Sequence, residues 1–152
     1  MKKRDFIILI VLLTFLNGCG YSPVFSKKTS NFAIVELKLS GDRKLNTIIN
    51  NNLNYYKNLE SKKLFSIVVN NNFDKQISSK DTKGNPKTFQ IKISSIIKVK
   101  NSNGNISEKI FSKSINYNNK SNKFDLKKYE DETIKNFGNK ISEEIIIYLQ
   151  SI

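Results

Sequence analysis

The residue types that most often carry out chemistry in proteins are scarce in this sequence. The chain has no histidine and one cysteine, Cys19, so it lacks a histidine general base and the usual sets of metal ligands. Neighbouring carboxylates occur as Asp131-Glu132 and Glu143-Glu144, which we interpret as solubilising charges on a helix surface. No glycine-rich phosphate loop is present. The sequence therefore predicts no catalytic residue, no metal site and no bound cofactor, and it argues against an envelope hydrolase, which would need carboxylates converging in a cleft.

Cys19 follows a segment that is typical of an export signal. Residues 2–4 are basic, and residues 6–16, FIILIVLLTFL, are almost wholly apolar. As a helix this run would reach roughly 16 Å, about half of the ~30 Å hydrocarbon core of a membrane, so it is too short to span one. A basic start, a short apolar core and small residues before a cleavage point predict a signal peptide over residues 1–18.

The end of this segment, Leu16-Asn17-Gly18-Cys19, resembles the bacterial lipobox, although Asn17 is unusual there. The resemblance implies an S-diacylglycerol on the Cys19 sulfur and, after cleavage, an N-acyl chain such as palmitate on its amine. Two or more acyl chains hold a protein firmly to a membrane. Gly20, rather than aspartate, favours the outer membrane by analogy. The alternatives are a buried free cysteine, which is a liability in an oxidising compartment, or a signal cut elsewhere.

The length and net charge of the exported part, residues 19–152, limit its number of domains and its type of partner. Residues 19–152 suit one domain, and they keep about +11 of the net charge of +13. A basic surface favours polyanionic partners such as anionic lipid or the phosphates of lipopolysaccharide, and export argues against nucleic acid. The alternative is compositional, because the chain is rich in Lys, Asn, Ile and Ser, as an AT-rich genome would encode. Arg43 is the only arginine after the signal, and arginine is the better phosphate ligand.

The first half of the body predicts a strand, a helix and a second strand. Residues 19–31 are the lipidated N-terminus and a linker, and residues 32–39 are a strand with Ala33, Val35, Leu37 and Leu39 on one face. An apolar stripe at spacings of three and four predicts a helix that ends near Leu59. Residues 64–69 predict a second strand, which suggests a parallel crossover. The polar residues 70–86 predict a long loop.

A long hairpin follows. Residues 89–100 alternate between apolar and polar side chains, and residues 101–105 predict a turn. Residues 106–117 predict the returning strand, with Phe111, Ile115 and Tyr117 on one face. We expect the lysines of this hairpin to form the ligand-binding site, the alternative being a solvated strand surface. The candidate residues are Lys92, Lys98, Lys100, Lys109 and Lys113.

The last segment predicts a long amphipathic helix that begins between Asn122 and Asp125. Its apolar stripe is expected to pack on the sheet, the alternative being a membrane surface or a partner. The predicted fold is an α/β (α+β) two-layer domain over residues 32–152. It has the order β-α-β-β-β-α, with a four-stranded mixed sheet and two helices on one face.

The whole layout resembles the lipopolysaccharide-assembly lipoprotein family LptE, in its alphaproteobacterial form. The residues that carry the resemblance run from Cys19 to Phe25, CGYSPVF, followed by strand, helix, strand, long hairpin and C-terminal helix. The resemblance implies a non-catalytic outer-membrane lipoprotein that plugs the β-barrel LptD, helps it assemble and assists lipopolysaccharide insertion into the outer leaflet. The body would lie on the periplasmic side or inside the barrel lumen.

A second function stays open from the sequence alone. A lipoprotein facing the periplasm could instead bind lipid as an auxiliary of another envelope transport system. That function predicts an apolar pocket able to hold an acyl chain, which a simple two-layer plug does not need.

Overall fold

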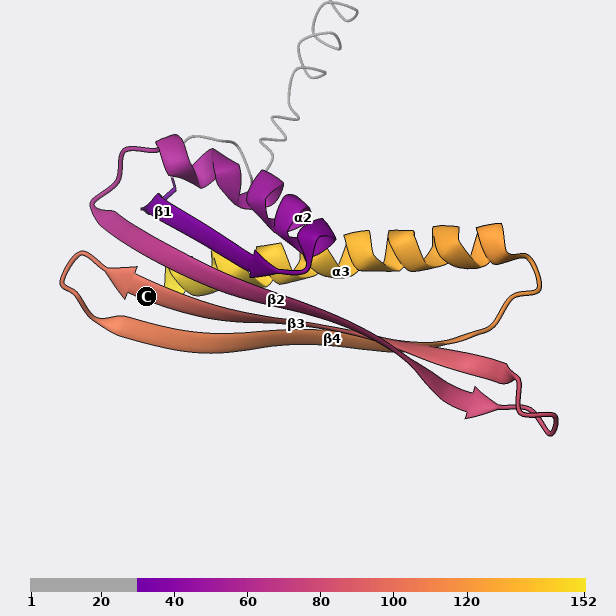
Figure 1. Ribbon diagram of the computed structural model, residues 1–152. Helices are drawn as coiled ribbons and strands as arrows, with labels where there is room; N and C mark the ends of the chain where they lie inside the picture. Colours follow the sequence, from indigo (N-terminus) through magenta and orange to yellow (C-terminus); the bar gives the residue numbers. More distant parts are fainter. Residues whose placement is uncertain (1–29) are drawn as a thin grey trace, which may run out of the picture.

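The computed structural model describes residues 30–152. The predicted leader, Cys19 and nearly all of the predicted linker lie outside the described residues. The described residues form a twisted sheet with both helices on one side of it (Figure 1). In chain order the elements are β1 (Phe32–Gly41), α2 (Arg43–Leu53), a short 3-10 helix η2 (Asn54–Asn58), β2 (Lys63–Lys80), β3 (Pro86–Asn101), β4 (Ile106–Asn118) and α3 (Lys123–Ser151). The predicted fold class, with its order β-α-β-β-β-α, is confirmed.

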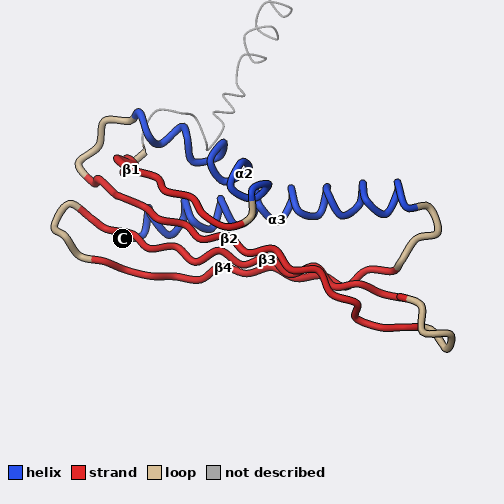
Figure 2. The backbone as a smooth tube through the Cα atoms, viewed as in Figure 1, coloured by secondary structure: helices blue, strands red, loops and turns tan. Residues whose placement is uncertain are grey.

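The sheet is mixed, with the spatial order β1-β2-β3-β4. β1 and β2 are parallel, and a parallel pair needs a crossover rather than a tight turn, which α2 supplies. The pairs β2–β3 and β3–β4 are antiparallel hairpins. β2 and β3 continue well beyond the end of β1 as a long twisted ribbon (Figure 2).

The prediction of a loop over residues 70–86 is wrong. Residues 70–80 continue β2 and pair with β3 as far as Pro86, so only residues 81–85 form the turn. The hydrogen bonds between strands are formed by the backbone, so polar side chains do not prevent them. The pairing of β2 with β1 ends at Asn71. Beyond that point the ribbon projects past β1 and is mostly exposed, so its residues need no alternation of apolar and polar types.

β1 contains a bulge that overturns the predicted face of this strand. The register with β2 shifts by one residue at Val35, whose side chain is 66% exposed. Leu37 and Leu39 lie opposite buried residues of β2, but Val35 does not share their face. A bulge bends the strand and re-aims its side chains, and neither Gly nor Pro marks this one in the sequence.

The connection between β1 and α2 is fixed by a glycine and a capping aspartate. Gly41 has a φ of +86°, in the region that favours glycine. The backbone N–H of Asp42 donates to the carbonyl of Asn71 (2.8 Å), and the Asp42 carboxylate accepts from the backbone N–H of Leu45 (2.9 Å). The side chain thereby satisfies one of the free donors at the start of α2.

The core lies between the sheet and the helices. α3 begins after Asn122, whose side chain caps it, and its buried stripe packs on the sheet as predicted. Gly138 allows close approach to α2, because a Cβ there would lie 2.9 Å from Cγ2 of Ile48. Within the described residues, the apolar core cluster extends from Phe32 to Leu149.

Candidate functional site

Neither α2 nor α3 covers one face of the sheet, here called the open face (Figure 1). Side chains alternate along a strand, so the register assigns residues to this face. Buried Ile91, Ile93 and Ile97 of β3 point to the helices, and their neighbours point to the open face. The open face is therefore built from every second residue of β2, β3 and β4.

The open face has two chemically different halves. The half near the start of β2 and β4 carries an apolar patch, consisting of Leu64, Val68, Ile96, Ile106 and Ile110. The other half carries three polar rows across β2, β3 and β4, consisting of Asn72-Ser94-Ser112, Asp74-Lys92-Ser114 and Gln76-Gln90-Asn116. The polar rows offer hydroxyl, amide and charged groups side by side, whereas the apolar patch offers aliphatic surface.

Three of the five candidate lysines lie on the open face, and acidic residues neutralise part of their charge. Lys98 forms an ion pair with Glu108 on the neighbouring strand (3.3 Å). Lys92 stands opposite Asp74 in the register of β2 and β3. Lys100 has Ser66 and Ile106 as its cross-strand neighbours, so it is the candidate lysine here with no acid opposite it.

The structure does not bring the other two candidate lysines into this group. Lys109 and Lys113 stand opposite Ile97 and Ile93, so they point to the helix side of the sheet. The ammonium of Lys113 pairs with Glu144 of α3, and that of Lys109 lies 4.8 Å from the centre of the Tyr148 ring. Both lysines hold α3 against β4, and the predicted five-lysine cluster is split between two faces.

The helix side also holds a polar group at the edge of the core. The Tyr117 hydroxyl donates to the Glu130 carboxylate (2.8 Å), which also pairs with Lys75 (2.7 Å). Burial first, and then the hydrogen bond to Glu130, hold the pKa of Tyr117 far above its usual value of 10.0. These residues tie α3 to β2 and β4, and the hydroxyl stays protonated at neutral pH.

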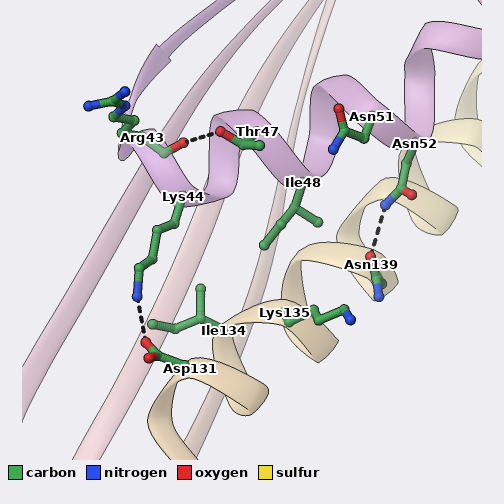
Figure 3. A pocket seen from close by; sticks show the side chains of 10 residues that line it. All are labelled: Arg43, Lys44, Thr47, Ile48, Asn51, Asn52, Asp131, Ile134, Lys135 and Asn139. Atoms are coloured by element: carbon green, nitrogen blue, oxygen red, sulfur yellow. Dashed lines mark hydrogen bonds and ion pairs between the residues drawn. The ribbon is translucent and has the colours of Figure 1, made fainter. Parts of the chain in front are cut away.

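A groove of about 660 Å³ lies between α2 and α3 on the outer side of the helices (Figure 3). Ile48 and Ile134 face each other across it, and the Lys44–Asp131 ion pair (2.5 Å) crosses one end. The ion pair holds the pKa of Asp131 below its usual value. At the other end the Asn52 amide donates to Asn139 (3.0 Å). The groove is thus bridged by the contacts that join the two helices.

Residues 30–152 contain neither a cluster of metal ligands nor a helix suited to span a membrane. No three or more Asp, Glu, His or Cys side chains gather there in a way that could hold a metal ion. No helix in the same range has the length and apolar character needed to cross a membrane. Cys19, the predicted lipidation site, lies outside this range, so its modification stays a prediction.

Comparison with known proteins gives a likeness at the level of structure. No family model matches the sequence, and no curated protein sequence matches it. The rare lipoprotein B from Shewanella oneidensis superposes with a TM-score of 0.59 at 13% identity, over 76% of this chain and 94% of that one. The chain shares the fold of rare lipoprotein B. A minor lipoprotein from Acinetobacter baumannii gives 0.56 at 9% identity, over 81% of this chain and 92% of that one.

Rare lipoprotein B and this chain are alike in fold, and the likeness extends over most of both chains. At 13% identity, however, no functional residue can be carried from rare lipoprotein B to this sequence. The site residues must therefore be argued from this chain alone. The role of Lys92, Lys98 and Lys100 in ligand binding stays a prediction, and the sequence analysis did not name the apolar patch. The sequence does contain a sign of this patch. Ile106 and Ile110 are an odd number of residues from the inward-facing Phe111, so they point to the opposite face of β4.

Proposed function

We propose that this chain is an outer-membrane lipoprotein of the LptE type, anchored through acyl chains on Cys19. In this function it occupies the lumen of the LptD β-barrel, helps that barrel assemble and assists the insertion of lipopolysaccharide. Two features support the anchor and the family, namely the leader that ends in LNGC and the fold shared with rare lipoprotein B. The alphaproteobacterial form of the family belongs to the same proposal and rests on the CGYSPVF segment.

The polar half of the open face carries this proposal. The lumen of a large membrane barrel is polar and lined with hydrogen-bonding groups. The three polar rows present serine, asparagine and glutamine side chains to a partner with no helix in the way. Such a surface can exchange hydrogen bonds with water for hydrogen bonds with a barrel wall. A plug of this kind works by shape and contact and needs no catalytic group.

Purification of the full-length protein from membranes in mild detergent tests the proposal. We expect a large β-barrel to be retained with it. A photo-crosslinking amino acid placed at Ser112, in the centre of the polar rows, should form an adduct with that barrel. The matched control carries Cys19→Ser as well, and loss of the lipid should reduce the adduct strongly. Recovery of the chain without any barrel, or adducts only with soluble proteins, contradicts the proposed function.

Lipopolysaccharide contact is the second part of the proposal. Its phosphates suit ammonium groups that stand clear of the helices, as those of Lys92, Lys98 and Lys100 do. Because these lysines are exposed, we expect the interaction to weaken as salt rises. Lys109 and Lys113 are excluded from this part, since both are engaged with α3.

The alternative function, an auxiliary that binds lipid for another transport system, needs a cavity for an acyl chain. A hollow of about 360 Å³ lies beside Phe124 at the start of α3. The groove between α2 and α3 also has apolar walls, which Ile48 and Ile134 supply. The helix-joining ion pair and amide contacts cross it at both ends. These bridges favour a structural role for the groove, so the barrel plug is the better supported function.

A further inference from the structure

The exposed apolar side chains of the described residues are concentrated at one end of the molecule. This end, here called the entry end, is where β1, β2 and β4 begin and where β3 and α3 finish (Figure 1). Ile106 and Ile110 are 71% and 61% exposed, and Leu64 and Val68 are exposed beside them. At the opposite end, the exposed large apolar residues are Ile77 in the β2–β3 ribbon and Phe124 at the start of α3.

Three members of the apolar patch, Val68, Ile96 and Ile110, adjoin one another across the sheet. Ile110 stands directly opposite Ile96, and Ile106 stands opposite Lys100 on the same face. Val68 lies opposite Lys98, one step along the sheet from Ile96. Opposite and diagonal positions on one face of a sheet have Cβ atoms about 5–8 Å apart, so Val68, Ile96 and Ile110 form one surface. The Lys98–Glu108 ion pair separates Ile106 from it. Contiguous exposed apolar surface of this kind marks a site of contact with a protein or a membrane.

The charges around the apolar patch favour an anionic partner. Lys100 lies within it and has no acid opposite it, and Lys62 and Lys63 lie at its margin where β2 begins. Two acids share the open face here, but each is already paired: Glu108 with Lys98 and Glu36 with Lys38. The Lys63 ammonium donates to the main-chain oxygen of Ile152 (2.6 Å), and Glu60 is exposed in the connection before β2. The positive charge that favours an anionic partner therefore comes from Lys100 and Lys62. Lysine beside isoleucine suits an interface between headgroups and acyl chains.

We propose that the apolar patch, together with Lys100, seats the body on an anionic phospholipid surface. The polar lumen of a barrel does not match this half of the open face. The polypeptide also enters the fold at this end, since β1 begins with Phe32. Ten residues lie between Cys19 and Ser30, and the eleven residue-to-residue steps limit the tether to about 37 Å. The tether length is the one part of the inference that rests on the proposed function, because it assumes that Cys19 carries the lipid.

Binding of residues 19–152 with Cys19→Ser to vesicles tests the inference without the lipid anchor. The vesicles contain phosphatidylcholine alone or with about a third of phosphatidylglycerol, and the partition coefficient is measured by co-sedimentation at low and high salt. We expect binding to the anionic vesicles that weakens with salt. Ile106→Ser with Ile110→Ser should lower the partition coefficient at least tenfold, because two exposed apolar side chains are lost from the contact. Lys100→Gln should lower it about fivefold, at low salt only.

Matched variants at the other end keep the test specific. Ile77→Ser with Phe124→Ser removes two exposed apolar residues there (48% and 76% exposed), and Lys80→Gln removes an exposed charge at the far end of β2. Both should leave binding to anionic vesicles unchanged.

Equal losses in these controls, or no loss in the Ile106 and Ile110 variant, overturn the inference. So does a stable dimer that the Ile110 change dissociates, because the patch then serves self-association. Co-purification of a barrel is a separate measurement, so either proposal can fail alone.

Discussion

The hydroxyl of Ser95 in β3 donates to the side-chain oxygen of Asn71 in β2 (2.5 Å), and both residues are buried. The amide of Asn71 in turn donates to the side-chain oxygen of Asn46 in α2 (2.8 Å). A polar chain therefore crosses the apolar core from the sheet to the first helix. Buried polar groups are stable only when they are paired in this way, and the pairing fixes α2 over β2 and β3.

Replacement of Asn71 by leucine should lower the free energy of unfolding by about 2–3 kcal/mol, because Ser95 and Asn46 both lose their partner. Urea denaturation measures this change. Asn72→Leu is the matched control, since Asn72 is exposed and on the open face, and it should stay within about 0.5 kcal/mol of the parent. Equal effects at the two positions would show that the polar chain does not stabilise the fold.

Gly41→Ala should be more damaging than Gly84→Ala, although both glycines have positive φ angles, +86° and +84°. A left-handed conformation costs an alanine about 1–2 kcal/mol at either position. At Gly41 the new Cβ would also lie 1.9 Å from the carbonyl oxygen of Asn71, whereas nothing lies within 4 Å at Gly84. Thermal unfolding of both variants measures the difference. A Gly41 variant as stable as the Gly84 variant would mean that the backbone can move apart there.

Tyr117 should make stability fall at alkaline pH. Burial and the hydrogen bond to Glu130 raise the pKa of Tyr117 above its unfolded value of 10.0. Because the folded pKa is the higher one, the contribution of Tyr117 to the free energy of unfolding is fully present below pH 10.0. This contribution is lost as pH rises through the folded pKa. The advantage of the parent over Tyr117→Phe should therefore be constant near pH 8 and shrink above about pH 10. Lysines titrate in both proteins, so their effect cancels in the difference. An advantage that does not change with pH refutes the assignment.

The elements predicted correctly from the sequence are those with one face buried in the core and the other exposed to water. β3 alternates because Ile91, Ile93 and Ile97 meet the helices, and α3 shows a helical stripe for the same reason. Residues 70–80 gave no such pattern, since Asn71 is buried through hydrogen bonds and the ribbon beyond it is solvated. The partners of Asn71 are distant in sequence, so no local signal could reveal them.

The five candidate lysines divide between the two faces of the sheet for a simple geometric reason, and their role in binding stays a prediction. Side chains alternate along β4, so residues with the parity of Phe111 point to the helices. Lys109 and Lys113 have that parity, while Ile106 and Ile110 do not. The sequence analysis grouped the five lysines by their charge and by the strand that carries them. Counting odd and even positions along each strand separates them into two faces. The bulge at Val35 was beyond such reasoning, because it depends on the fit of β1 to β2.

The two lysine groups should respond differently when lipopolysaccharide binding is measured. Lys92→Gln, Lys98→Gln and Lys100→Gln together remove three exposed charges from the open face, and we expect at least a tenfold loss of affinity at low salt. The double change Lys109→Gln and Lys113→Gln removes charges that contact α3, so it should lower the melting temperature and leave affinity nearly unchanged. Calorimetry with lipopolysaccharide, beside thermal unfolding, measures both effects. Equal losses of affinity in the two variants would mean that net charge, rather than the open face, attracts the ligand. An unchanged affinity in the triple variant would remove these lysines from the proposed function.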